Sequence, residues 1–108
     1  MRRQVAFFVL LMGCAAPSEH EVQAAFHSFV ASHNRCERDE DCALMFPGCP
    51  LGCYAAVHRS AVEEAEQVAR GLIADYEAPG RACFYQCIAD CGVRCAENVC
   101  APITDCQP

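Results

Sequence analysis

The sequence predicts a small disulfide-rich α+β domain. Eleven of its 108 residues are cysteine, a density typical of exported modules whose apolar core is too small to hold them alone. Two stretches, at about 19–33 and 61–76, place apolar residues at helical spacing. The other segments are short and rich in turn-forming residues, which favours short antiparallel strands and a C-terminal hairpin.

The first helix is predicted to begin after Ser18, which opens the pattern Ser-Glu-His-Glu. Glu21 stands three residues further on, so the two residues can form a capping box. We expect the apolar face that follows to pack on the domain rather than on a membrane. This face consists of Val22, Ala25, Phe26, Phe29, Val30 and His33.

The second helix is predicted to begin at a similar pattern, in which Ser60 and Glu63 form a capping box. Pro79 and Gly80 end the helical region. Its apolar face consists of Ala61, Ala65, Val68, Ala69, Leu72, Ile73 and Tyr76.

Short strands are predicted between the two helices. Residues 41–46 favour a strand that Pro47 and Gly48 end, and residues 49–53 favour a turn. Residues 54–58 are expected to be extended.

A hairpin is predicted near the C-terminus, with Glu97 and Asn98 as its two-residue turn. Cys95 and Cys100 would then face each other in a non-hydrogen-bonded pair, whose short Cα separation suits a disulfide. Alternatively, both side chains point to one face and each bonds to another part of the domain. The sequence leaves these alternatives open.

The N-terminus has the layout of an export signal. Two arginines precede an apolar run over residues 5–12, and Gly13 and Cys14 follow. The run is far shorter than the ~20 residues that a membrane-spanning helix needs. We therefore expect a signal that is removed rather than a lasting transmembrane anchor.

The sequence Leu11-Met12-Gly13-Cys14 resembles the lipobox of bacterial lipoproteins. This resemblance implies a signal peptide over residues 1–13, cleavage before Cys14, and acylation of that cysteine with fatty acids such as palmitate. Two or three acyl chains hold a protein stably on a bilayer, whereas one does so only marginally.

The same resemblance implies a lipidated tether over residues 14–18 and a single cysteine-rich domain over residues 19–108. In lipoproteins, a residue other than Asp after the lipidated cysteine implies the outer membrane, and Ala15 stands there. Taken whole, the chain resembles small cysteine-rich lipoproteins of proteobacteria, which implies an outer-membrane location and indicates no particular activity.

The lipobox also resolves the odd number of cysteines. With Cys14 acylated, ten remain, and in an oxidising compartment we expect five disulfides. The spacing does not predict which cysteines pair. The ten are Cys36, Cys42, Cys49, Cys53, Cys83, Cys87, Cys91, Cys95, Cys100 and Cys106.

The charge excludes some classes of partner. The chain has 14 acidic residues, eight arginines and no lysine, for a net charge of −6. It therefore lacks the basic face that nucleic-acid binding requires, and it is too acidic to adsorb on anionic lipid by charge. We expect a membrane partner only through the lipid on Cys14, and an unknown envelope protein as the other partner.

Cys83, Cys87, Cys91 and Cys95 recur at every fourth residue, which on one helix would align their thiols as in a metal or cluster site. Gly92 and the neighbouring β-branched and aromatic residues disfavour such a helix, and export disfavours free thiolates. We therefore expect disulfides and no metal.

No catalytic constellation stands out. Cys49 and Cys53 are one residue too far apart for the Cys-x-x-Cys pattern of thiol oxidoreductases, and no serine lies in a nucleophile-elbow motif. We therefore predict no catalytic residue and no cofactor, and expect the histidines to be solvated or packed. The histidines are His20, His27, His33 and His58.

The acidic segment 36–42 carries Asp39 and Asp41, whose oxygens could bind calcium, but too few ligands accompany them. Its pattern Cys-x-x-Asp-x-Asp-Cys resembles a phrase of whey-acidic-protein-like antiproteases over seven residues only. The paired cysteines that should follow soon afterwards are missing. We expect both aspartates to accept hydrogen bonds from backbone amides in local turns.

These observations favour a non-enzymatic, lipid-anchored envelope protein, a module that binds another component or serves a structural role. The alternative hypothesis is a protease inhibitor presented on the membrane. Its bait would lie between Cys42 and Cys53, at Leu44-Met45-Phe46 in particular.

Overall fold

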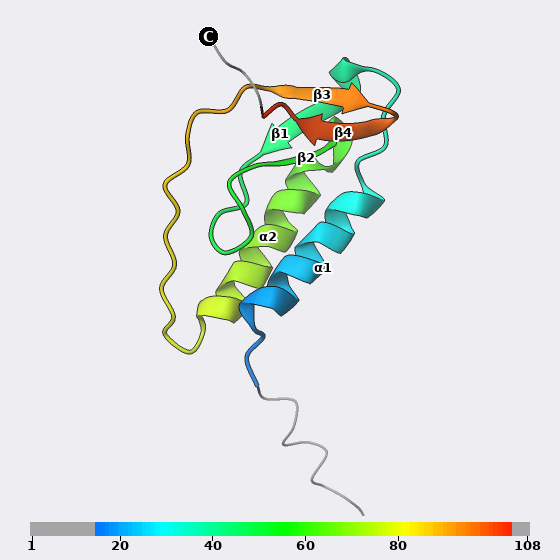
Figure 1. Ribbon diagram of the computed structural model, residues 1–108. Coiled ribbons are helices and arrows are strands. Elements are labelled where there is room, and N and C mark those ends of the chain that lie inside the picture. The colour runs from blue at the N-terminus through cyan, green and yellow to red at the C-terminus, as the bar shows by residue number, and fades with distance from the viewer. Residues whose placement is uncertain (1–14, 105–108) are drawn as a thin grey trace, which may run out of the picture.

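The computed structural model describes residues 15–104, which contain two α-helices and two antiparallel two-stranded sheets. The helices lie side by side, and both sheets lie toward one end of the helix pair (Figure 1). This architecture confirms the predicted small disulfide-rich α+β fold with a C-terminal hairpin. The elements are α1 Glu19–Ser32, β1 Cys42–Met45, β2 Ala55–His58, α2 Val62–Glu77, β3 Val93–Ala96 and β4 Val99–Pro102.

Helix α1 begins as the sequence predicts. The Ser18 hydroxyl accepts from the Glu21 amide at 3.1 Å, and the Glu21 carboxylate accepts from the Ser18 amide at 2.8 Å, which completes a capping box. Val22 and Phe26 are each only 1% exposed, so the apolar face packs on the domain. Ala25 is exposed, which makes the buried face narrower than predicted.

Helix α2 has the predicted extent, but the predicted capping box with Ser60 and Glu63 is wrong. The chain leaves β2 through a 3-10 turn, Arg59–Ala61, and Ser60 lies inside that turn. The Ser60 amide donates to Nδ1 of His58 at 3.2 Å. Ala61 is the N-cap of α2 and offers no side-chain cap. His58 therefore caps the 3-10 turn.

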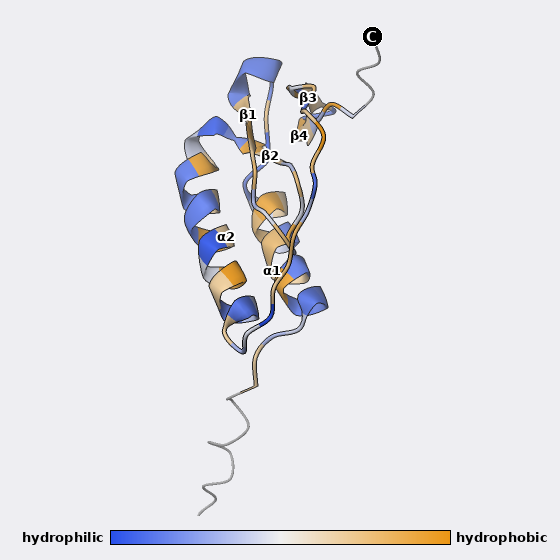
Figure 2. Cartoon of the chain, turned by 90° about the vertical axis from the view of Figure 1, so that its left-hand side faces the viewer, coloured by the Kyte–Doolittle hydropathy of each residue, from blue (hydrophilic) through white to orange (hydrophobic). Residues whose placement is uncertain are grey.

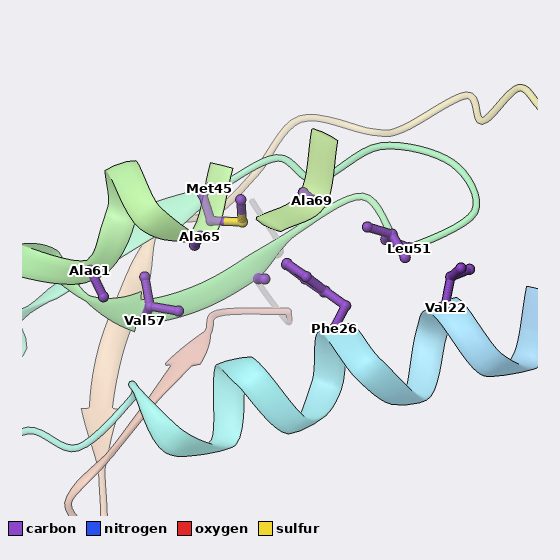
Figure 3. Close-up of a cluster of buried hydrophobic side chains, with 9 residues drawn as sticks. Val22, Phe26, Met45, Leu51, Val57, Ala61, Ala65 and Ala69 are labelled. Carbon is purple, nitrogen blue, oxygen red and sulfur yellow. The ribbon is translucent and has the colours of Figure 1, made fainter. Parts of the chain in front are cut away.

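The main core lies between the two helices and the β1–β2 sheet (Figure 3). Phe26 projects from α1 into this space, where the small side chains of Ala65 and Ala69 let α2 approach closely. Burial of a Phe or Met side chain contributes roughly 1.5–3 kcal/mol. The buried set is Val22, Phe26, Met45, Leu51, Ala55, Val57, Ala61, Ala65 and Ala69.

The turn between β1 and β2 is packed against this core. The amide of Gly48 donates to the Gly52 carbonyl at 3.0 Å, and a second bond runs from the Gly52 amide to the Gly48 carbonyl at 3.1 Å. Pro50 is buried, and its carbonyl accepts from the Gln23 side chain of α1 at 2.8 Å. The turn is therefore a fixed platform for the two cysteines that it carries.

The predicted C-terminal hairpin is confirmed. Glu97 and Asn98 have φ of 54° and 68°, the left-handed pair that a two-residue type I′ turn requires. Asn98 also accepts from the Cys36 amide through its carbonyl, at 3.1 Å, and donates from its side chain to the Cys36 carbonyl, at 3.0 Å. The turn is thus tied to the segment that follows α1.

Of the two alternatives for the hairpin cysteines, the structure has the second. Cys95 and Cys100 are opposite partners in the β3–β4 register, yet Cys95 bonds to Cys36 and Cys100 bonds to Cys42. The Sγ atoms of Cys36, Cys42 and Cys95 lie within 4.8 Å of one another. The two adjacent disulfides attach the hairpin to the β1–β2 sheet.

The predictions for residues 1–13, for Cys14 and for Cys106 lie outside the described residues. Among the helices of residues 15–104, none is both long and apolar enough to cross a bilayer.

Candidate binding surface

Residues 81–92 connect α2 to β3 and form neither helix nor strand. We call this segment the strap. It runs alongside the rest of the domain from the end of α2 to the start of β3 (Figures 1 and 2). The sequence predicts short strands and turns here, and the strands are wrong. Within the described part of the chain, the backbone of residues 81–90 makes no hydrogen bond to another backbone group.

Both ends of the strap are fixed by noncovalent contacts. At its start, the guanidinium of Arg81 lies 4.4 Å from the centroid of the Tyr76 ring, a cation–π contact that ties it to α2. At its end, the carbonyl of Gly92 accepts from the amide of Ile103 at 2.9 Å. The strap therefore has a defined entry and exit.

The middle of the strap is held by disulfides. Cys83 bonds to Cys49, and Cys87 bonds to Cys53, with Cα separations of 5.6 and 5.8 Å. Both partners belong to the packed turn between β1 and β2. Cys91 is disulfide-bonded as well. Covalent links thus position a segment that lacks backbone pairing.

The strap exposes large apolar side chains to solvent. Phe84 is 89% exposed, Ile88 82% and Tyr85 45%. Beside them, Phe46 is 62% exposed and contacts the Tyr54 ring edge-to-face, with centroids 5.3 Å apart. Phe46, Tyr54, Phe84 and Tyr85 contribute to the lining of an open pocket of ≈ 340 Å³. Contiguous exposed apolar surface of this kind is typical of interaction sites.

The strap is also uncharged over most of its length. Between Arg81 and Asp90 no residue carries a charge, although the whole chain has a net charge of −6. A partner at this surface would be recognised through apolar and backbone contacts rather than through charge.

The acidic segment 36–42 has a structural role. Asp41 accepts from the amides of Glu37 and Arg38 at 2.8 and 3.2 Å, as predicted for a local turn. These backbone hydrogen bonds, that from Glu37 first, lower the pKa of Asp41 below its usual value. Asp39 accepts from the amide of Cys95 at 2.8 Å. Its role differs from the prediction, because this bond links distant segments.

The histidines do not assemble into one site. His33 donates from Nδ1 to a carbonyl of α1 at 2.8 Å, and Nδ1 of His58 accepts from the amide of Ser60. These two line one open pocket, whereas His20 and His27 are exposed on α1. The packed or solvated roles match the expectation for each.

The row of cysteines at every fourth residue does not form a helical face. Cys83, Cys87 and Cys91 lie in the irregular strap, and Cys95 lies in β3. Cys83 and Cys87 bond to the turn between β1 and β2, and Cys95 bonds to Cys36. The expected disulfide state is therefore present at these four positions.

The prediction that Leu44, Met45 and Phe46 form an exposed bait loop between Cys42 and Cys53 is wrong. Met45 is 1% exposed and belongs to the core, and Leu44 is paired in β1. Only Phe46 of that trio is exposed. Strand pairing of Leu44 and burial of Met45 thus keep this trio from forming a presented loop.

The sequence does not predict the strap, because its apolar residues show no helical or strand periodicity. The pattern that could have indicated it is the uncharged stretch 82–89, in which adjacent aromatic residues lie between two cysteines.

Comparison with known proteins gives no relative. No protein-family model matches the chain, and no curated protein or solved structure matches it. The structure therefore defines its class by architecture, a small α+β domain held by disulfides.

Proposed function

We propose that this chain is a lipid-anchored protein of the bacterial cell envelope that acts by binding another envelope protein rather than by catalysis. The observation that carries the binding role is the strap, a disulfide-held segment that presents Phe84 and Ile88 at 89% and 82% exposure.

The anchor rests on the sequence Leu11-Met12-Gly13-Cys14, which resembles a lipobox. Acylation of Cys14 would provide the membrane attachment. Ala15 after the cysteine favours the outer membrane by the lipoprotein sorting pattern.

The position of the strap suits a module that is held close to a membrane. Residues 15–18 enter the domain at the end of the helix pair where the strap also begins (Figure 1). Four extended residues span at most about 14 Å. An anchor at Cys14 would therefore keep the strap within reach of proteins at the membrane surface.

The rigidity of the strap also supports a binding role. Association is weakened by the entropy lost when flexible segments become ordered. The disulfides of Cys83 and Cys87 order the strap before any partner binds. Exposed aromatic side chains on an ordered segment are the usual anchors of a protein interface.

The anchor is tested by replacing Cys14 with Ser and labelling cells with an alkyne fatty acid. We expect the label on the chain to be lost and the precursor to accumulate unprocessed. A chain that is still acylated and cleaved in this variant would overturn the anchor.

The binding role is tested by crosslinking in native membranes, followed by capture of the lipidated chain. A partner captured by the wild type should be lost with Phe84→Ser and retained with Val99→Ser, a matched change at a residue of β4 that is 38% exposed. Partners that ignore both changes, or no partner at all, would contradict binding through the strap.

A further inference from the structure

We propose that the strap is an inhibitory loop for a serine protease with an apolar primary specificity pocket, and that Phe84 is the residue that enters this pocket. The inference rests on the proposed binding role of the strap and names the class of its partner.

The first argument concerns the backbone of the strap. Over residues 81–90 its amides and carbonyls make no hydrogen bond to the backbone of the described residues. Proteins that receive an extended segment recognise it chiefly through main-chain hydrogen bonds, with pockets for its side chains. The strap offers free main-chain groups of this kind.

The second argument concerns the shape of the partner. Residues 84–90 are all exposed, so side chains that point in alternating directions all face solvent. A flat sheet edge would cover only one side of such a segment. A cleft covers several sides at once, and the substrate cleft of a protease has this form.

The third argument concerns the side chain. Phe84 is 89% exposed and follows Cys83 directly, so a disulfide holds the backbone next to it. In chymotrypsin-like enzymes the primary pocket is a hydrophobic slot. An aromatic side chain in an uncharged segment fits that slot, whereas the acidic pocket of a trypsin-like enzyme requires a cation.

The fourth argument concerns the consequence of cleavage. Hydrolysis of the Phe84–Tyr85 peptide bond would consume one water and leave a carboxyl group on Phe84 and an amine on Tyr85. The two halves of the chain would remain joined by disulfides that cross the cut, so the new ends could not separate freely. The crossing disulfides are Cys36–Cys95, Cys42–Cys100 and Cys53–Cys87.

Insertion of the strap into lipid is the less favourable alternative. Its exposed aromatic residues would suit a membrane, but its unpaired backbone would not. Each unsatisfied backbone group costs several kcal/mol in the hydrocarbon region, where water is absent. A protein cleft can supply the missing hydrogen bonds, and a bilayer cannot.

The test measures inhibition of chymotrypsin and trypsin by the full chain, purified with its lipid in detergent, with chromogenic peptide substrates. We expect the wild type to inhibit chymotrypsin and not trypsin. Phe84→Lys should weaken inhibition of chymotrypsin about 30-fold or more, the size of effect that loss of an interface hot spot produces. The same variant should gain inhibition of trypsin.

The matched control is Val99→Lys, because Val99 is an apolar residue of β4 that is 38% exposed and lies outside the strap. This variant should keep the wild-type inhibition of chymotrypsin within about threefold. Intact mass after thiol alkylation verifies that each variant keeps its disulfides.

Three results would overturn the inference. One is the absence of inhibition of chymotrypsin, elastase and subtilisin at about ten-micromolar protein. A standard-size interface has a dissociation constant below that concentration. Another is equal loss with Phe84→Lys and Val99→Lys. The third is protection of Phe84 and Tyr85 from hydroxyl-radical labelling in lipid vesicles, which would indicate insertion into lipid.

The failure of this inference is distinguishable from the failure of the binding role. If membrane crosslinking captures a partner that requires Phe84 and is not a protease, the strap is a binding surface and the inhibitor assignment is wrong.

Discussion

Two phenylalanines show how differently the two parts of this molecule are held. Phe26 of α1 is 1% exposed in the core, and Phe84 of the strap is 89% exposed. The core is held by apolar side chains from both helices and from the β1–β2 sheet. The strap contributes no residue to that core and is fixed by cysteines and by its two ends.

This difference means that one set of apolar residues stabilises the fold and another set is exposed for recognition. A segment that buries its apolar residues gains stability but cannot use them for recognition. Disulfides can hold a segment in place without burying its side chains. They stabilise a fold by restricting the unfolded chain rather than by adding contacts in the folded one. The strap can therefore be ordered and still leave its aromatic residues available.

The largest expected effect compares the two phenylalanines directly. Phe26→Ala should lower the free energy of unfolding by about 3–5 kcal/mol, because it leaves a cavity in the core. Phe84→Ala should change it by less than about 0.5 kcal/mol, as is usual for exposed positions. Urea unfolding of the oxidised protein, followed by circular dichroism, measures both. Similar losses for the two variants would show that the strap belongs to the cooperative core.

The next effect concerns the covalent links. Removing one strap disulfide with Cys53→Ala and Cys87→Ala should lower the free energy of unfolding by about 2–4 kcal/mol. Limited proteolysis within the strap should accelerate, while hydrogen-exchange protection in α1 and α2 should follow only the global loss. The matched control replaces Cys42 and Cys100, whose disulfide holds the hairpin. If both pairs of changes accelerate cleavage of the strap equally, the strap and the hairpin are one unit.

The regions that the sequence predicts correctly are those with local determinants. The Ser18 and Glu21 box and the spacing of Val22 and Phe26 specify α1 within a few turns of chain. The hairpin likewise follows from two adjacent residues with positive φ, Glu97 and Asn98. Patterns of this length are decided by neighbours along the chain.

The features that the sequence does not predict depend on residues that are distant along the chain. Cys95 faces Cys100 but bonds to Cys36, 59 residues away, and no local pattern indicates that choice. Ser60 and Glu63 have the spacing of a capping box, but the chain leaves β2 through a 3-10 turn. His58 caps that turn, and Ser60 lies inside it. The strap is the extreme case, since disulfides to a remote turn replace any repeating pattern.

The smallest expected effect tests whether the acidic segment belongs with the core rather than with the strap. The amides of Glu37 and Arg38 lower the pKa of Asp41 in the folded protein. A carboxylate whose pKa is lower in the folded than in the unfolded chain stabilises the fold above its unfolded pKa. That stabilisation is lost as the pH falls through the folded pKa.

Asp41→Asn should therefore lower the free energy of unfolding at pH 7 slightly, and the difference from the wild type should vanish in strong acid, where both side chains are neutral. Urea unfolding at the two pH values measures this. The rate of limited proteolysis within the strap at pH 7 should not change, since Asp41 acts on the segment that Cys36 and Cys42 tie to the hairpin. A variant that is equally destabilised at both pH values would mean that the amide side chain disturbs the turn for reasons unrelated to charge. Faster cleavage of the strap would show that the two regions are coupled.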